Sequence, residues 1–510
     1  MIVEPGLASF ETGYASGASQ VVWTRLIDDL ETPVSAYLKL AHARPYAFLF
    51  ESVEGGAWRG RYSVIAMKPD LVWRCRGDQA EVAQGAAIEA NAFTPQSGGA
   101  LDSLRDLVAA SRLDLPAGLP PMSAGIFGAI GYDMIRLVEK LPNVNPDPLN
   151  LPDGLMIRPS IVAIFDAIAQ EIILVTTVRP GQGDAAAAYD EAVARLTAVH
   201  DDLRQPAPPL TGAGVAEPDA FTTPVERADY HRIVEKAKGF IQAGDIFQVV
   251  PSHRFRAPFA KDPFALYRSL RRMNPSPFLF YLNFGDFQLA GSSPEILVRL
   301  RDGKITIRPI AGTRPRGATP EEDRALEADL IADPKERAEH LMLLDLGRND
   351  VGRVAMLNKA GSNAPPTPSK GAHVRVTASF FVERYSHVMH LVSNVEGDAP
   401  EGLDPVDVLM AALPAGTLSG APKVRAMEII DELEIEKRGI AYAGAVGYFG
   451  ADGSVDTCIV LRTACFKDGM MYVQAGGGVV ADSDPDAEYD ETLHKARALR
   501  RAAEESWRFV

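Results

Sequence analysis

The sequence predicts an α+β fold in which largely antiparallel sheets pack as a sandwich with helices on the outside. Tight turns separate strand-like runs of the C-terminal half, at Gly285-Asp286, Asp302-Gly303, Asp452-Gly453 and Asp468-Gly469. Such turns join antiparallel strands, whereas parallel strands need long crossover connections. Helices are expected to start near Asp229, Pro334, Pro422 and Pro485. Helices packed on an antiparallel sheet make an α+β fold rather than a doubly wound one.

Composition is typical of a soluble globular protein. The 510 residues are 46% hydrophobic and 23% charged, and the net charge of −15 argues against nucleic-acid binding. No signal peptide is visible, and no apolar run approaches the roughly 20 residues that span a bilayer. The three cysteines form no metal-binding spacing and suit a reducing compartment. We therefore expect a cytoplasmic protein with neither a membrane nor a nucleic-acid partner.

An irregular stretch divides the chain into two regions. Residues 205–224 are dense in Pro, Gly, Ala and Thr and are expected to form a linker between an N-terminal region, residues 1–204, and a catalytic domain, residues 225–510. In the N-terminal region, strands are expected at residues 46–52 and 61–66 around a Gly55-Gly56 turn, and a hairpin at residues 161–165 and 172–177. A second irregular stretch, residues 358–371, is expected to be a surface loop.

Two pairs of glutamates mark a candidate site. Asp333 can cap a helix that starts at Pro334 and that Gly347 is expected to end. Within it, Glu336 and Glu339 lie one turn apart and project from one face. Glu336 could serve only as part of a capping box, and Glu339 could lie on a solvated edge. A second pair one turn apart, Glu488 and Glu491, at the start of the last helix, favours ligands instead.

Two glycine-containing stretches indicate close contact with a ligand or another backbone. Residues 416–423 place small residues before a helix, where free N–H groups attract a carboxylate or phosphate, although a plain loop-to-helix turn is the more common explanation. Residues 475–478 interrupt a strand with three glycines, which permit a close approach. Neither stretch matches a phosphate loop or a dinucleotide fingerprint.

Four motifs occur in an order that resembles the chorismate-utilising enzymes. They are Pro-Ile-Ala-Gly-Thr-Arg-Pro-Arg-Gly at residues 309–317, Asp-Pro-Lys-Glu-Arg-Ala-Glu-His at 333–340, Thr-Leu-Ser-Gly-Ala-Pro-Lys at 417–423 and Gly-Gly-Gly-Val-Val at 476–480. Residues 49–52, 61–63 and 274–279 resemble motifs of anthranilate synthase component I. The resemblance covers nearly the whole chain and rests on the order and spacing of the motifs.

The resemblance implies a reaction of chorismate and ammonia that gives anthranilate and pyruvate with Mg²⁺, the first step of tryptophan biosynthesis. It implies four catalytic residues, Glu295, Glu336, His390 and Thr417. It implies that substrate is bound by Gly312, Thr313, Tyr442, Arg462, Gly476, Gly478 and Lys495. It implies that Glu339 and Glu491 bind the metal, with Glu488 near the metal or its waters. Mg²⁺ takes oxygen ligands, commonly one or two protein carboxylates plus waters and substrate oxygens.

Two positions distinguish this chain from other members of the family. Relatives that add water carry a lysine base where this chain has Gln248, and aminodeoxychorismate synthases carry a lysine nucleophile where it has Ala311. Anthranilate synthase is therefore favoured, with aminodeoxychorismate synthase component I as the alternative. An inactive amino-acid sensor or scaffold is less favoured, because Glu339, Glu491 and His390 are all present.

The resemblance also implies a partner subunit and an inhibitor. None of the cysteines is placed for glutamine hydrolysis, so ammonia would come from a separate glutamine amidotransferase subunit, component II, in a heterotetramer. Tryptophan would inhibit from a distinct pocket formed by Glu51, Ser52, Pro277, Phe278 and Leu279. Alternatively, these residues form an ordinary strand end and a rigid turn.

Overall fold

The computed structural model describes residues 1–27, 29–52, 60–142, 144–181, 183–208, 221–356, 373–385 and 388–510. The predicted turn at Gly55-Gly56, most of the predicted linker at 205–224 and the predicted loop at 358–371 lie outside the described residues.

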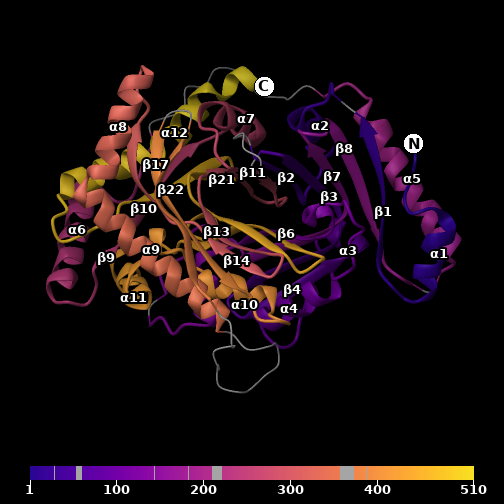
Figure 1. Cartoon of the computed structure of the whole chain (residues 1–510), viewed down its shortest axis with the longest axis horizontal. Coiled ribbons are helices and arrows are strands. Elements are labelled where there is room, and N and C mark those ends of the chain that lie inside the picture. Colours follow the sequence, from indigo (N-terminus) through magenta and orange to yellow (C-terminus); the bar gives the residue numbers. More distant parts are fainter. Residues whose placement is uncertain are drawn as a thin grey trace.

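Two antiparallel sheets form the centre of the molecule (Figure 1). The first runs in the order β1 (Gln20–Ile27), β8 (Glu171–Val178), β7 (Gly154–Asp166), β3 (Tyr62–Arg76), β2 (Ala47–Glu51), β11 (Phe278–Asn283), β12 (Gln288–Ser293), β21 (Thr463–Lys467), β22 (Met470–Gly476) and β10 (Ser252–Pro258). A separate short ladder pairs β9 (Gln248–Val249) with β18 (Gly420–Ala421).

The second sheet shares the long strands β3 and β7 with the first. Its order is β5 (Thr94–Pro95), β4 (Gln79–Gln84), β3, β7, β6 (Gly125–Ile130), β19 (Ala445–Gly450), β20 (Val455–Ile459), β13 (Ile296–Arg301), β14 (Lys304–Ile307), β17 (Val388–Asp398) and β16 (Arg375–Arg384). β15 (Ile310–Pro315) continues along β17 after β14. Because the sheets are joined through β3 and β7, their strands form one connected structure.

Alternating side chains divide the apolar residues of the sheets between two faces. Phe48, Phe127 and Val446 belong to the cluster between the sheets, whereas Leu49 and Ile126 belong to clusters on the outer faces. Burial of both faces explains why strands such as β2 and β6 are apolar at nearly every position. The predicted sandwich of antiparallel sheets with external helices is confirmed.

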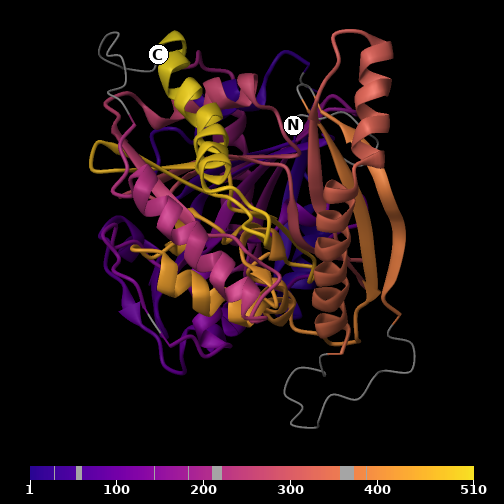
Figure 2. The ribbon, with the colours of Figure 1, turned by 90° about the vertical axis from the view of Figure 1, so that its left-hand side faces the viewer.

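Helices cover both outer faces and one end of the sandwich. The first sheet is covered by α2 (Pro33–Leu40), α5 (Ala185–Leu203), α7 (Pro263–Met273) and α12 (Pro485–Glu505). The second is covered by α4 (Ala100–Ala110), α9 (Pro334–Ala355) and α10 (Pro405–Ala412). α6 (Arg227–Gln242) and α11 (Lys423–Leu433) share a smaller core with β9. Figure 2 shows α8 (Pro320–Ala332) above α9, beside β16 and β17.

The remaining elements are short and lie between the strands and helices already described. They are α1 (Leu7–Ala15), α3 (Ala86–Glu89), and the 3-10 turns η1 (Pro121–Ser123), η2 (Tyr132–Leu137), η3 (Gly416–Leu418), η4 (Gly439–Ala441) and η5 (Ser506–Phe509).

The four predicted tight turns all join antiparallel neighbours. They connect β11 to β12, β13 to β14, β19 to β20 and β21 to β22. In each turn the glycine has a positive φ, between 69° and 92°, a conformation that glycine adopts without strain. The predicted hairpin in the N-terminal region is likewise confirmed as β7 and β8.

The predicted end of a helix at Gly347 is wrong, because α9 continues to Ala355. Gly347 lies on the buried side of this helix, where an added Cβ would lie 3.0 Å from Cγ of Pro309. Val351 and Val354, beyond the glycine, are fully buried, and their burial outweighs the poor helix propensity of one glycine. Gly347 therefore permits close packing of α9 on the sheet.

Strands from both sides of the predicted linker pair with one another. β2 pairs with β11, and β6 pairs with β19, so each sheet contains segments from residues 1–204 and from residues 225–510. The division into an N-terminal region and a catalytic domain stays a prediction.

Two glycine substitutions test the close packing of α9. Gly239→Ala, inside α6 with no atom within 4 Å of the new Cβ, should raise the free energy of unfolding by about 0.5–1 kcal/mol. Gly347→Ala makes the same helix-propensity gain but must displace Pro309, so it should give no such increase. Denaturant unfolding of both variants measures the difference, and equal gains would contradict the close contact.

Candidate active site

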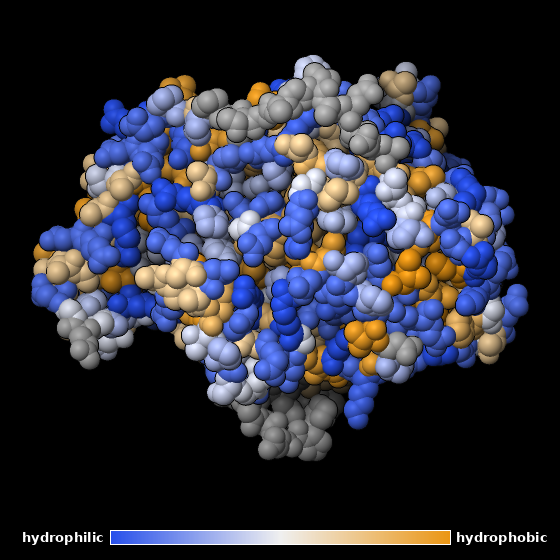
Figure 3. Space-filling view, turned by 180° about the vertical axis from the view of Figure 1, so that it is seen from behind, coloured by the Kyte–Doolittle hydropathy of each residue, from blue (hydrophilic) through white to orange (hydrophobic). Residues whose placement is uncertain are grey.

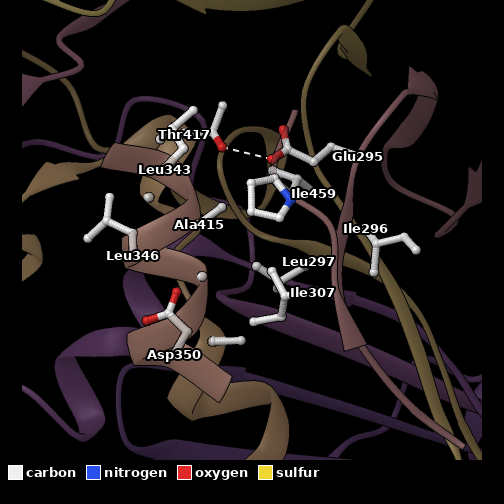
Figure 4. Close-up of a pocket in the computed structure, with 14 residues that line it drawn as sticks. Glu295, Ile296, Leu297, Ile307, Leu343, Leu346, Asp350, Ala415, Thr417 and Ile459 are labelled. Atoms are coloured by element: carbon white, nitrogen blue, oxygen red, sulfur yellow. Dashed lines mark hydrogen bonds between the residues drawn. The ribbon is translucent and has the colours of Figure 1, made fainter. Parts of the chain in front are cut away.

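Glu295 and Thr417 form the centre of the candidate site. Glu295 lies between β12 and β13, is 5% exposed, and accepts a hydrogen bond of 2.8 Å from Oγ1 of Thr417 in η3. Figure 4 shows the two side chains meeting at one end of a small pocket, with Asp350 of α9 toward the other end. Burial raises the pKa of Glu295 to about 8, although Thr417, the Ile310 N–H and the charge of Arg462 act to lower it. The carboxyl group therefore holds its proton near neutral pH.

His390 is placed as a neutral imidazole beside this pair. It lies on β17 opposite Thr313 of β15, and its Nδ1 is 3.0 Å from Oγ1 of Thr313 and 3.1 Å from the carbonyl oxygen of Gly312. Burial, aided by the charge of Arg462, lowers the pKa of His390 to about 4. Because a carbonyl only accepts hydrogen bonds, Nδ1 carries the proton and Nε2 is left as the basic nitrogen.

The first carboxylate pair lies in the first turns of α9. Asp333 caps the helix by accepting from the N–H groups of Lys335 and Glu336. Oε1 of Glu336 lies 3.0 Å from Nη1 of Arg314. Gly312, at φ +69°, has no room for a side chain, since a Cβ there would lie 3.0 Å from Oε2 of Glu336. The motif around Gly312 therefore holds Glu336 against the bulge in β15.

Glu339 faces the second pair on α12. Burial raises the pKa of Glu339, and the negative charges of Glu336 and Glu491 raise it further. Burial, with the charge of Glu491, also raises the pKa of Glu488. Oε1 of Glu488 accepts a 2.7 Å hydrogen bond from Ser483, while its buried Oε2 has no partner in the part of the chain that the structure describes. The starts of the two helices thus converge on one acidic region.

This acidic region fits Mg²⁺ in the chemistry of its donors. The described residues contain no group of three histidine, cysteine or acidic side chains arranged to hold a metal ion. Glu339 and Glu491 would instead supply two carboxylates, which Mg²⁺ commonly completes with waters and substrate oxygens. A divalent cation would also relieve the repulsion that raises the pKa of Glu339, and Oε2 of Glu488 is free to accept from a metal-bound water.

Arg462 provides a cation to the site, and Tyr442 provides a neutral hydroxyl. The guanidinium of Arg462 makes no hydrogen bond or ion pair with a described residue, although it is close enough to influence Glu295 and His390. Burial raises the pKa of Tyr442, and the nearby N–H of Gly476 acts to lower it. Arg462 can therefore bind an incoming carboxylate without breaking an existing ion pair.

Lys495 and two glycines, Gly476 and Gly478, line another part of the candidate site. Nζ of Lys495 lies 2.8 Å from Oε1 of Glu491 and donates to the carbonyl oxygen of Gly476 at 2.8 Å. A Cβ at Gly478 would lie 2.6 Å from Nε2 of Gln248, whose own Oε1 is buried without a partner among the described residues. Of the substrate-binding residues predicted from the sequence, these contacts place Lys495 and Gly476 beside Glu491 and Gly478 beside Gln248.

The residues of the predicted tryptophan pocket lie elsewhere, in the first sheet. Glu51 on β2 is paired with Leu279 on β11, and its carboxylate is bound in a bidentate manner by Arg271 and contacted by the Tyr267 hydroxyl. Oγ of Ser52 is buried without a partner in the described chain. The ammonium of a ligand would therefore compete with Arg271 for Glu51, and the pocket stays a prediction.

Two arginines with structural roles at the site were missed by the sequence analysis. Arg314 bridges Asp329, Asp333 and Glu336, and Arg438 lies behind the site in contact with Glu434. Arg314 lies inside the quoted motif at 309–317, which could have pointed to it. The only sequence signal for Arg438 is its i,i+4 spacing from Glu434, which is typical of a surface pair, because its other partners are backbone carbonyls distant in sequence.

The family model described as "chorismate binding enzyme" matches residues 68–501, most of the chain and all of the candidate site. The chain belongs to the chorismate-binding enzymes. Anthranilate synthase component 1 of Cereibacter sphaeroides is 58% identical over 504 residues, covering 98% of both chains. That of Pseudomonas putida is 48% identical, covering 93% of both.

Solved structures agree with this assignment. Anthranilate synthase component I from Streptococcus pneumoniae TIGR4 superposes on this chorismate-binding enzyme with a TM-score of 0.75 and 35% identity, covering 93% of this chain and 99% of that one. MenF, the menaquinone-specific isochorismate synthase of Escherichia coli, gives a TM-score of 0.70 at 18% identity over 98% of both chains, which shows a shared fold.

One face of this chorismate-binding enzyme is mostly polar. Figure 3 shows a predominantly hydrophilic face with smaller separate apolar groups. Among the described residues, no helix is both long and apolar enough to cross a lipid bilayer.

Thr417→Val tests the role of the hydrogen bond to Glu295. The bond favours the ionised carboxylate, so its loss should raise the pKa of Glu295 further. A hydrogen bond worth about 1 kcal/mol corresponds to roughly 0.5–1 pH unit. The limb of the pH–rate profile that reports Glu295 should move upward by this amount. Thr457→Val, which removes a buried hydroxyl bonded to the Val298 carbonyl, is the control and should leave the limb unchanged.

Proposed function

We propose that this chorismate-binding enzyme is component I of an anthranilate synthase, which converts chorismate and ammonia to anthranilate, pyruvate and water. The observation that carries the proposal is the 58% identity, over 98% of both chains, to a protein named anthranilate synthase component 1. Ala311 and Gln248 support it, because each stands where sibling activities need a lysine.

The candidate site has the groups that this reaction requires. Chorismate carries two carboxylates, and Arg462 offers a cation that no described side chain neutralises through an ion pair. Loss of the ring hydroxyl needs a proton donor, and Glu295 is protonated near neutral pH. Aromatisation needs a proton acceptor, and Nε2 of neutral His390 can serve. Glu336, paired with Arg314, would lie at the edge of the ring site.

Mg²⁺ would be held by Glu339 and Glu491, with Glu488 toward its waters, and would polarise the substrate as a Lewis acid. Arg314 and Lys495 hold two of the surrounding carboxylates, Glu336 and Glu491, in place. The carboxylates come from the first turns of two helices, whose caps at Asp333 and Asp484 fix their directions.

The aminodeoxychorismate synthase alternative is disfavoured by Ala311. This residue is buried on β15, next to the bulge at Gly312, and a methyl group cannot attack the substrate ring. The scaffold alternative is disfavoured by the energetic cost of the site. Burying Glu295, and keeping Glu339 and Glu488 partly buried beside other carboxylates, is unfavourable unless these groups bind something.

Ammonia would be supplied by a glutamine amidotransferase subunit, component II, within a cytoplasmic heterotetramer. The three cysteines of this chain are all buried, and burial raises the pKa of each thiol, that of Cys465 to about 12. A thiol with so high a pKa is not a ready nucleophile at neutral pH. The chain itself is therefore expected to use free ammonia and not glutamine.

The direct test is to incubate the purified chain with chorismate, Mg²⁺ and ammonium chloride and to identify the aromatic product by fluorescence and mass. Anthranilate is expected, at a rate that increases with pH as more ammonia is unprotonated. With glutamine in place of ammonium, no product is expected. Formation of 4-amino-4-deoxychorismate would select the alternative enzyme, and absence of any turnover would favour the scaffold.

Glu491→Ala tests the metal assignment. Turnover should fall by about 100-fold or more, because a Lewis acid contributes several kcal/mol to such a reaction. Stability should change little, since the Glu491–Lys495 pair is nearly half exposed and such pairs contribute about 0–1 kcal/mol. Glu504→Ala on the same helix removes a similar exposed pair and is the control. Full activity of Glu491→Ala, or activity unaffected by EDTA, would refute the assignment.

Ser52→Arg tests the proposed feedback site. Tryptophan must bind one conformation better than the chorismate-bound one in order to inhibit. An arginine at Ser52 would fill the space beside its unpartnered hydroxyl, so turnover should stay near the wild-type value while tryptophan inhibition is lost. Ser9→Arg on exposed α1 is the control. Inhibition of Ser52→Arg at the wild-type tryptophan concentration would show that the site lies elsewhere.

A further inference from the structure

Arg438 is an almost fully buried cation that the proposed chemistry does not use. It lies between α11 and η4, is 2% exposed, and forms an ion pair with Glu434, which is 6% exposed. Burying such a pair is costly and contributes little net stability compared with apolar packing. This pair differs from an ordinary buried ion pair because the Arg438 guanidinium also connects separate segments of the chain.

The guanidinium connects the turn that carries Thr417 to the strand that carries Gln248. Nη1 donates to the Leu418 carbonyl at 2.6 Å, and Nη2 donates to the Val250 carbonyl at 2.7 Å. Leu418 directly follows Thr417, and Val250 directly follows β9. Both carbonyls are in buried residues next to the short β9–β18 ladder, where no further strand pairing satisfies them.

The ladder itself leaves no space for independent movement. Gly420, at φ +141°, pairs with Val249, and a Cβ on Gly420 would lie 2.2 Å from the Gln248 carbonyl oxygen. The two segments are therefore in direct backbone contact, and Arg438 fixes their ends relative to each other.

Two further contacts connect Glu434 and Arg438 to residues that are proposed to bind the substrate. Oε1 of Glu434 accepts from the N–H and hydroxyl of Ser252, both at 2.8 Å, and Ser252 pairs with Gly476 across β10 and β22. The ring of Tyr442 lies against the guanidinium, with its centroid 5.4 Å from Cζ of Arg438. The backbone N–H of Gly476 lies close enough to the Tyr442 hydroxyl to act against the rise in its pKa.

We propose that Arg438 is a positioning residue of the chorismate site, which holds the Thr417 turn, the Gln248 strand and Tyr442 in register through its planar fork of donors. The inference rests on the proposed function, because its effect is read in the turnover of chorismate. Arg438 itself lies behind these groups and acts through Leu418, Val250 and Tyr442. A lysine cannot replace it, because a compact ammonium cannot hold a carboxylate and two carbonyls in one plane.

The test compares Arg438→Lys with the matched control Arg158→Lys. Arg158 is also a buried arginine, 6% exposed, and is bonded to Asp70, but it lies on β7 away from the site. Both variants should lower the melting temperature. Only Arg438→Lys should lower kcat, by about 10- to 100-fold, and move the Glu295 limb of the pH–rate profile upward as Thr417→Val does. The charged group facing Glu295, Arg462, is untouched in both variants.

A double variant separates positioning from a general loss of stability. If Arg438 acts through the Thr417 turn, adding Arg438→Lys to Thr417→Val should lower kcat by less than about threefold further. The proposal would be overturned if kcat of the double variant fell by the product of the two separate effects. It would also be overturned if Arg438→Lys kept the Glu295 limb of the pH–rate profile at its wild-type position.

Should Arg438→Lys fail to fold, the paired variant Arg438→Gln with Glu434→Gln serves, because it leaves no buried charge uncompensated. Wild-type kcat in that folded variant would overturn the proposal equally. Turnover by the wild type is measured first. Its absence would overturn the function and this inference together, whereas normal turnover by Arg438→Lys would overturn only the role of Arg438.

Discussion

The repulsion among carboxylates gathered in one place is the constraint on which the rest of this structure depends. Glu336, Glu339, Glu488 and Glu491 converge from the starts of two helices, Glu295 is buried beside Thr417, and the fold handles their charges differently. Glu336 is neutralised by Arg314 and Glu491 by Lys495, whereas Glu295 avoids charge by keeping its proton. Glu339 and Glu488 are left partly uncompensated, and their pKa values are raised by burial and by neighbouring charge.

Burial of these carboxylates lowers the free energy of unfolding, and the proposed function requires it. A carboxyl group whose pKa is raised on folding contributes stability below its unfolded value, near 4.5, and loses it as pH rises through the folded value. For Glu295 that window runs from about 4.5 to about 8. Near neutral pH the burial of Glu295 therefore lowers the free energy of unfolding. Apolar clusters cover both faces of both sheets, and their burial offsets the stability that is lost at the site.

The sequence allowed prediction of those features that depend on neighbouring residues. The Asp-Gly and Gly-Asp turns, the Asp333 cap and the one-turn spacing of each glutamate pair are local, and the structure has them as predicted. The length of α9 was not predictable in this way, because Gly347 is explained by Pro309, which is distant in sequence. Spacing alone also gave no reason to select Glu295, Thr417 or Arg462. Their importance comes from burial and from contacts across sheets, and only the family resemblance pointed to them.

The sharing of both sheets by the two ends of the chain has a consequence for synthesis on the ribosome. β6 cannot pair with β19 until the ribosome has synthesised β19, roughly 300 residues later. At about 5–20 residues per second, this delay is roughly 15–60 s. During that time the nascent chain presents an apolar strand edge, which is prone to pair with other chains. Cellular yield of this protein should therefore depend on chaperones that shield nascent strands as much as on the stability of the finished fold.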